Sequence, residues 1–134
     1  MVTIIDTSNA PMGRAASLIA NRLLKGEQIV IVNSEKAIIT GKKQQIKMHY
    51  KMKRELGTSR KGPFFPRTPD RILKRSVRGM LPYQRVKGRK AYKNLKTYIG
   101  VPPEFQDKKV ELLWEKPKPI HFITLEELSK SLRT

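Results

Sequence analysis

Cysteine is absent from this 134-residue sequence, and acidic residues are scarce, at 11 against 29 lysines and arginines. Without cysteine the chain has neither disulfides nor thiolate metal ligands. No apolar run approaches the roughly 20 residues that span a membrane, and the first residues do not have the layout of a signal peptide. With 38% hydrophobic and 30% charged residues, we expect one globular domain in the cytoplasm, with no membrane association.

The shortage of acidic residues is concentrated in one segment, residues 42–96. This segment holds 19 lysines and arginines but only two carboxylates, Glu55 and Asp70, so a net charge of +17 out of the chain's +18 lies there. Charge that serves solubility is spread evenly, whereas a polyanion-binding face concentrates it. Like charges at this density repel each other unless something negative lies against them. A solvated charged face is the alternative, but the composition favours a polyanion partner.

The amino-terminal third has the pattern of a βαβ unit. We expect a short strand at residues 3–6 and then a helix between Pro11 and Gly26. Four branched apolar residues at 29–32 are typical of a strand covered on both faces, as in a parallel sheet. The helix is expected because apolar residues recur on one face: Met12, Ala15, Ala16, Ile19, Ala20 and Leu23. The unit predicts two parallel strands joined by a right-handed crossover.

Helical patterns lie beneath the basic residues. A helix over residues 42–56 would turn Ile46 and Tyr50 inward. A second helix is expected to begin at Pro69, with Thr68 as its capping residue, and to end near Gly79, since glycine and a following proline are stop signals. Its apolar face would hold Ile72, Leu73, Val77, Met80 and Leu81. A third short helix after Gly88 and a strand at 97–99 complete the segment.

The last third of the chain is less distinctive. Pro102 and Pro103 mark a boundary, and a modest apolar run follows at residues 110–114. A closing helix is expected over residues 124–132, where Thr124 and Glu127 have the spacing of a capping box. We find no internal repeat.

The sequence offers little for catalysis. Gly41-Lys42 is similar to the end of a phosphate-binding loop, but Lys36 stands where an earlier glycine is required, and the Ser or Thr is also missing. The only histidines lack metal-ligand spacing: His49 is expected to pack against its helix or to face RNA, and His121 to lie on an edge strand. We therefore predict no catalytic residue, no metal site and no cofactor.

Aromatic residues are interleaved with the basic ones. They are candidates for stacking on unpaired bases, although packing is the alternative for each, and Tyr83 and Phe64 are the best stacking candidates. The predicted RNA contacts are sixteen cations: Lys42, Lys43, Lys47, Lys51, Arg54, Arg60, Lys61, Arg67, Arg71, Lys74, Arg75, Arg78, Lys87, Arg89, Lys90 and Lys93. Specificity would then come more from RNA shape than from base reading.

One segment carries a family resemblance. Val77-Arg78-Gly79-Met80-Leu81-Pro82, then Gly88-Arg89 and later Tyr98-Ile99-Gly100, resembles the signature of the ribosomal protein L13 family. Gly13-Arg14 before the alanine-rich helix, and Val32-Asn33-Ser34-Glu35-Lys36 before Thr40-Gly41-Lys42, are also similar to the family. The resemblance covers residues 2–100, and the loop at 57–67 is similar to the archaeal and eukaryotic branch.

The resemblance implies one three-layer α/β/α domain over residues 1–134, around a small, mainly parallel sheet of about four strands. Residues 101–134 would be a carboxyl-terminal extension that family inference covers poorly. It also implies a protein without catalysis, cofactor or small-molecule substrate that is a constituent of the large subunit of the cytoplasmic ribosome. There the chain would bind and stabilise 23S-type rRNA during assembly and contact neighbouring ribosomal proteins.

Two other functions remain open from the residues alone. One is a free-standing basic protein that binds nucleic acid, for example by compacting DNA. The other is a small phosphate-ligand enzyme built on the βαβ unit. An enzyme of that kind needs convergent polar groups in a concave site, and the sequence shows no such constellation.

Overall fold

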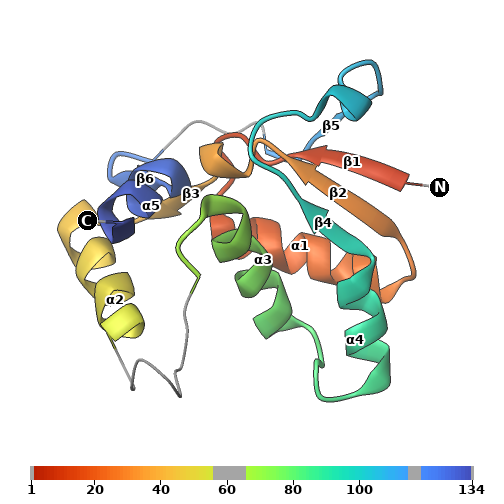
Figure 1. Cartoon of the computed structure of the whole chain (residues 1–134), viewed down its shortest axis with the longest axis horizontal. Coiled ribbons are helices and arrows are strands. Elements are labelled where there is room, and N and C mark those ends of the chain that lie inside the picture. The colour runs from red at the N-terminus through yellow and green to blue at the C-terminus, as the bar shows by residue number, and fades with distance from the viewer. Residues whose placement is uncertain (1, 56–65, 115–118, 134) are drawn as a thin grey trace.

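The computed structural model describes residues 2–55, 66–114 and 119–133, apart from the side chains of residues 54 and 133. The elements follow in the order β1 (Val2–Asp6), α1 (Met12–Leu24), β2 (Gln28–Val32), the 3₁₀ turn η1 (Ser34–Lys36), β3 (Ile38–Thr40), α2 (Lys43–Glu55), α3 (Pro69–Met80), α4 (Val86–Lys93), β4 (Leu95–Thr97), the 3₁₀ turn η2 (Pro103–Phe105), β5 (Glu111–Leu112), β6 (Phe122–Thr124) and α5 (Leu125–Arg133) (Figure 1). Within these described residues, no helix is both long enough and apolar enough to cross a membrane.

The main sheet is parallel throughout and has the order β4-β2-β1-β5. Its centre is the predicted βαβ unit, in which β1 pairs with β2 so that Ile5 lies opposite Ile31. A separate two-stranded antiparallel sheet joins β3 to β6. The predicted α/β fold around a small, mainly parallel sheet of about four strands is therefore confirmed.

The two faces of the main sheet are covered differently. Helices α1, α3 and α4 cover one face (Figure 1), where Ile5, Ile29 and Ile31 are buried. Because side chains alternate along a strand, Ile4 and Val30 point to the other face, where they pack against Phe105 of η2. The layer on this second face consists of the 3₁₀ turn and the loop around it.

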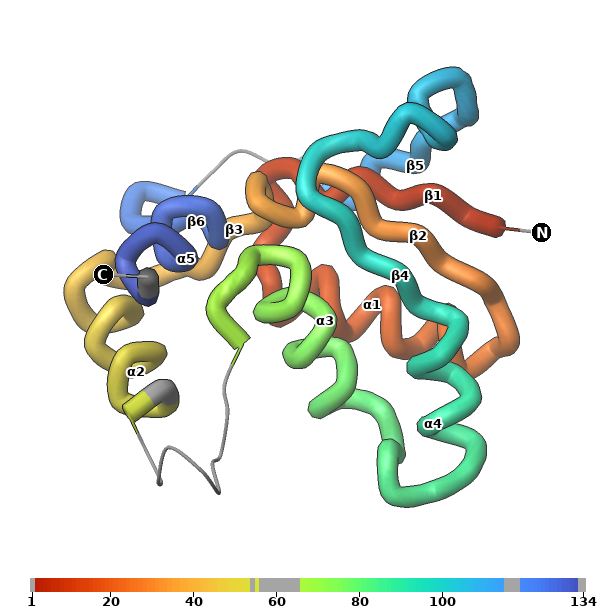
Figure 2. The backbone as a smooth tube through the Cα atoms, viewed as in Figure 1, coloured from red at the N-terminus to blue at the C-terminus, as the bar shows by residue number. Residues whose placement is uncertain are grey.

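The carboxyl-terminal segment supplies part of the core. The backbone returns after residue 119 to lie beside β3 and α2 (Figure 2). Ile123, Leu125, Leu128 and Leu132 are buried in the same cluster as the inner faces of α1 and α3. The hydroxyl of Ser129 donates a hydrogen bond of 2.7 Å to the carbonyl of Arg67, just before α3. Helix α5 therefore supports the start of α3.

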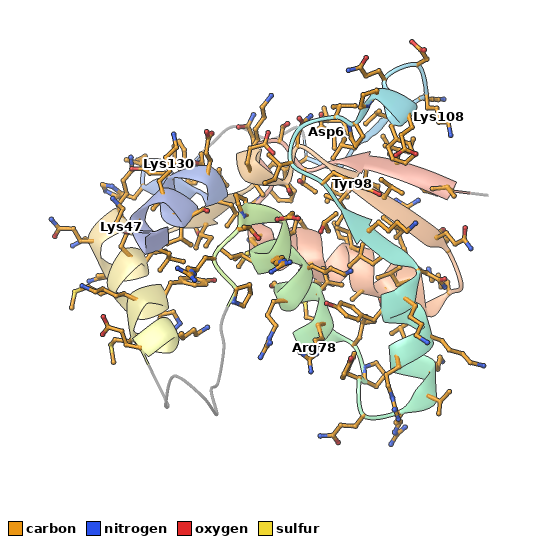
Figure 3. All side chains as sticks on the ribbon, viewed as in Figure 1. Asp6, Lys47, Arg78, Tyr98, Lys108 and Lys130 are labelled. Atoms are coloured by element: carbon orange, nitrogen blue, oxygen red, sulfur yellow. The ribbon has the colours of Figure 1, made fainter. Side chains whose placement is uncertain are left out.

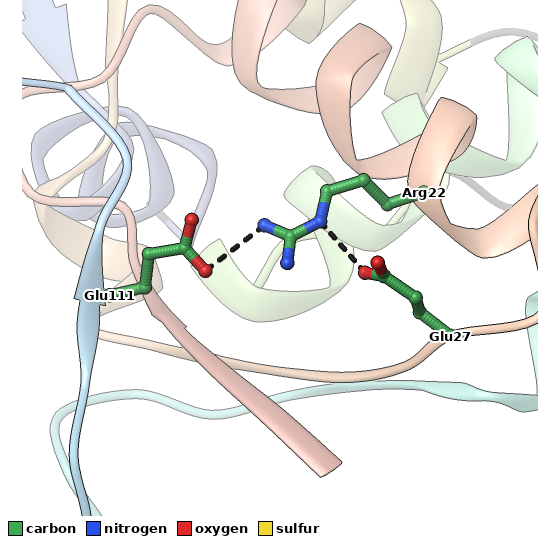
Figure 4. A network of polar contacts seen from close by, with 3 residues as sticks. All are labelled: Arg22, Glu27 and Glu111. Atoms are coloured by element: carbon green, nitrogen blue, oxygen red, sulfur yellow. Dashed lines mark hydrogen bonds and ion pairs between the residues drawn. The ribbon is translucent and has the colours of Figure 1, made fainter. Parts of the chain in front are cut away.

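A second link fastens the strand β5 to α1. Arg22 lies between two carboxylates, with its Nε 2.7 Å from Glu27 and its Nη1 3.2 Å from Glu111 (Figure 4). Glu111 stands opposite Ile5 in the register of β5 with β1. This strand is only two residues long, so the ion pair adds a side-chain anchor to a short backbone pairing.

Two sequence-based boundaries are wrong because tertiary packing decides them. The strand expected at 97–99 is β4 at Leu95–Thr97, where Leu95 is buried opposite Ile29. The helix expected after Gly88 begins two residues earlier, and Gly88 faces the preceding turn. A Cβ at position 88 would overlap the carbonyl group of Pro82, so glycine allows α4 to lie against this turn.

Several side chains differ from the sequence-based prediction in their exposure or position. Met80 was expected on the buried face of α3, but it is 44% exposed, whereas Leu81, which caps the helix, is buried in the core as expected. Of the two alternatives for His49, packing inward is wrong, because the residue is exposed, with its ring 5.6 Å from that of Tyr50; the RNA-facing alternative stays a prediction. His121 lies immediately before β6, not within it.

The predicted cap of α5 is confirmed, since the amide of Glu127 donates a hydrogen bond to the hydroxyl of Thr124.

Replacing Leu128 with Ala tests whether the carboxyl-terminal segment contributes to the core. The side chain is fully buried, so we expect the free energy of unfolding to fall by about 2–5 kcal/mol in urea denaturation. Ile120→Ala is the control: this residue is 93% exposed, and its truncation should change stability by less than about 0.5 kcal/mol. Equal stabilities of the two variants would contradict a core role for α5.

Candidate nucleic-acid interface

The sequence of α3 decides which of its side chains face outward. Ile72, Leu73 and Val77 are buried, so the intervening positions are left at the surface. Pro69 occupies the first turn, and Thr68 is the cap residue, as predicted. The carbonyl of Thr68 accepts the first helical hydrogen bond, from Ile72 at 3.0 Å, but its side chain makes no capping bond.

A groove of about 930 Å³ runs between α3 and β4, and half of its described lining residues are cations. We call it the α3–β4 groove. Figure 3 labels two of its lining residues, Arg78 on α3 and Tyr98 directly after β4. Among the described residues that line it, Asp70 is the one carboxylate. Six cations surround it: Arg67, Arg71, Lys74, Arg75, Arg78 and Lys96.

The groove brings together five of the sixteen predicted contact residues and adds Lys96. Lys96 reaches the groove because the parallel pairing of β4 with β2 carries this strand alongside α3. The sequence pattern placed Lys96 on the outward side of the short helix after Gly88, and it was not among the sixteen selected contacts. It lies on the edge strand β4, opposite Val30, and it lines both the groove and a second depression along the edge of β4.

Cations outnumber carboxylates in the described lining of the groove by six to one. The ion pairs of Arg22, Lys43, Lys47 and Lys130 with glutamates lie outside it. Six cations beside one carboxylate repel each other and create a positive potential that a concave wall focuses. The arrangement is suited to binding a polyanion.

Aromatic rings hold two of these cations in place. The Nζ of Lys74 lies 5.0 Å from the ring centre of Tyr92, and the guanidinium of Arg78 lies 4.2 Å from that of Tyr83. The two tyrosines meet edge to face at 5.5 Å. Cation–π contacts of this kind are worth about 0.5–1 kcal/mol at exposed sites. They restrict both side chains before any ligand binds, which lowers the entropy lost on binding.

The aromatic stacking candidates have different outcomes. Tyr83 is half-buried, and Arg78 already covers its ring. Phe64 lies outside the described residues.

Burial raises the pKa of the Tyr92 hydroxyl, and the nearby Arg78 opposes this effect only in part. Tyr92 is therefore neutral at physiological pH and contributes its ring rather than a charge.

The predicted cations of α4 do not line the α3–β4 groove. Lys87, Arg89, Lys90 and Lys93 are exposed on the helix surface. Arg89 donates a hydrogen bond of 3.2 Å to the carbonyl of Gln84 in the preceding turn. Lys93 lines a different depression, of about 520 Å³, along the edge of β4.

The predicted cations of α2 form a separate group. The Nζ atoms of Lys43 and Lys47 lie 3.3 and 3.9 Å from the carboxylate of Glu127 in α5, so their charge is partly neutralised within the chain. Lys42 and Lys51 are exposed. The predictions for Arg60, Lys61 and the side chain of Arg54 fall outside the described residues.

Comparison with known proteins identifies relatives along most of the chain. Residues 1–104 match the family model of ribosomal protein L13. The large ribosomal subunit protein uL13 of Archaeoglobus fulgidus is 48% identical over 97% of this chain and 86% of its own length. The proteins of the same name from Methanopyrus kandleri and Methanocaldococcus jannaschii are each 46% identical, over 97% and 98% of this chain and 86% and 97% of their own lengths. The similarity therefore continues beyond residue 104 into the carboxyl-terminal segment.

The raised pKa of Tyr92 predicts a loss of stability in alkali. At neutral pH the hydroxyl is protonated in both the folded and the unfolded chain. Above pH of about 10 the unfolded chain loses this proton first, so the free energy of unfolding falls as the pH rises. Urea denaturation of the wild type and of Tyr92→Phe between pH 9 and 11, approximate limits set by that value, should show a steeper fall for the wild type. Parallel curves would contradict the shift.

Proposed function

The chain belongs to the ribosomal protein L13 family, and we propose that it is a structural constituent of the large subunit of the cytoplasmic ribosome, of the archaeal type. It binds large-subunit rRNA and stabilises its folded arrangement during assembly. The observation that carries this proposal is the α3–β4 groove, in which six cations converge beside a single carboxylate.

The proposed mechanism is neutralisation of phosphate groups by a preformed surface. The parallel sheet and the buried face of α3 form a rigid platform, so the cations are held at fixed spacings. Arginine suits bidentate contacts with phosphate oxygens, and lysine supplies a compact charge. RNA strands that converge repel each other through their phosphates, and a groove of this charge lowers that repulsion. Contacts of this kind select RNA by its shape more than by its sequence.

The sixteen predicted cations contribute unequally in this proposal. Arg67, Arg71, Lys74, Arg75 and Arg78 line the groove together with Lys96 and form the main contact. The exposed cations of α4 extend the surface. Lys43 and Lys47 contribute less, because a phosphate would compete with Glu127 for them.

The same membership favours a scaffold over an enzyme. The family is one of ribosomal proteins, and the groove lining contains cations, tyrosines and threonines around one aspartate, with no histidine. The chain has no small-molecule substrate in this proposal. Its other partners are neighbouring proteins of the large subunit.

Salt dependence of RNA binding tests the electrostatic mechanism. If about eight phosphates are engaged, log affinity plotted against log salt should have a slope between about −6 and −7. The measurement is a titration of large-subunit rRNA fragments with the full chain at several salt concentrations. A slope near zero would reject the mechanism, and equal affinity for duplex DNA would favour a general nucleic-acid-binding protein instead.

A charge-matched pair of variants tests the groove itself. Arg71→Gln with Arg75→Gln removes two charges from its lining and should reduce the magnitude of the salt slope by about 1.5–2. Lys25→Gln with Lys130→Gln removes the same charge from exposed positions outside the groove and should leave the slope nearly unchanged. If both double variants lose binding equally, net charge rather than the groove is responsible.

A further inference from the structure

The glycines of the described residues fall into two groups. Gly26, Gly41 and Gly100 adopt a positive φ, which other residues rarely tolerate, and Gly88 lies against Pro82, where no Cβ fits. Gly13 and Gly79 have neither reason: a Cβ added at these positions would have no atom within 4 Å. The fold, as far as the structure describes it, does not explain these two glycines.

Gly79 is the more informative of the two, because it lies inside a helix. Glycine is less favourable than alanine in a helix, and α3 continues past it to Met80. Gly79 is not the residue that ends the helix, since its φ is not positive and Leu81 is the cap. The chain therefore has a glycine at an exposed helical position where alanine would stabilise the helix more and where the described structure does not require glycine.

The surroundings of Gly79 indicate what the missing side chain leaves room for. It lies in the wall of a depression of about 450 Å³ that also contains Arg75, Arg78 and Arg85, and the described residues of its lining include no carboxylate. Arg75 and Arg78 line the α3–β4 groove as well, so the two concave surfaces lie next to each other. A strand bound in the groove can pass over Gly79.

We propose that the sugar–phosphate backbone of an RNA strand lies directly against the backbone of α3 at Gly79, with one phosphate bound among Arg75, Arg78 and Arg85. Three guanidinium groups that line one depression match a phosphate, because arginine pairs with it bidentately. The stacking of Arg78 on Tyr83 holds one of these groups in place in advance. This inference rests on the proposed RNA-binding function and gives that function a definite point of close approach.

Gly13 provides a matched control. It lies in α1 and equally has room for a Cβ, but among the described residues of the depression beside it Arg14 is the one cation, together with apolar groups such as Trp114 and Ile39. No residue lines both this depression and the one at Gly79. A glycine-to-alanine change here alters the helix without changing the three-arginine site.

The experiment compares Gly79→Ala, Gly79→Leu and Gly13→Ala with the wild type, using thermal unfolding and titration of large-subunit rRNA fragments at several salt concentrations. We expect Gly79→Ala to raise Tm by roughly 2–5 °C and to weaken RNA binding about tenfold. The magnitude of the salt slope should fall by about one, as one phosphate contact is lost. Gly79→Leu should weaken binding further, and Gly13→Ala should retain wild-type affinity.

The outcomes separate this inference from the proposed function. If the wild type binds rRNA and both Gly79 variants bind equally well, the close approach at Gly79 is wrong while the function stands. If Gly13→Ala loses as much affinity as Gly79→Ala, the effect belongs to helix glycines in general and the inference is also overturned. If the wild type itself does not bind rRNA, both proposals fail.

Discussion

Repulsion between the cations along α3 is the constraint on which the rest of this structure depends. Like charges held within one groove favour its opening, and burial of the apolar face of the same helix opposes that effect. Ile72, Leu73 and Val77 are almost completely inaccessible to solvent. Burying an aliphatic side chain of this size stabilises a fold by about 1.5–3 kcal/mol, so three of them outweigh several repulsions between solvent-screened charges.

The carboxyl-terminal segment helps to hold α3 in place against this repulsion, a role that its sequence does not suggest. Helix α5 adds Leu125, Leu128 and Leu132 to the core beneath α3, and Ser129 fixes the backbone of Arg67 at the entrance of the groove. Glu127 of the same helix neutralises two lysines of α2. One element therefore strengthens the support of the cationic groove while it reduces the charge of the neighbouring helix.

A glycine and a tyrosine together determine the arrangement of residues 78–89. Gly88 brings α4 against the turn at Pro82, and this turn carries Tyr83 to a position beneath Arg78. The two glycines that this region shares with the family signature therefore have different physical explanations. Gly88 is explained by packing, because no Cβ fits beside Pro82. Gly79 lies on an open surface, where the described structure does not require a glycine.

The sequence by itself determined the α/β class, the helix at Pro69 and the outward direction of the cations on α3, because hydrophobic periodicity and local capping residues act over a few neighbouring positions. It did not determine the position of β4, the exposure of Met80 or the pairing of Lys43 and Lys47 with Glu127. Nor did it separate the groove cations from those of α4, or select Lys96 and Arg85. Those features depend on contacts between residues far apart in the chain, and only the packing of β4 beside β2 and of α5 beside α2 brings those residues together.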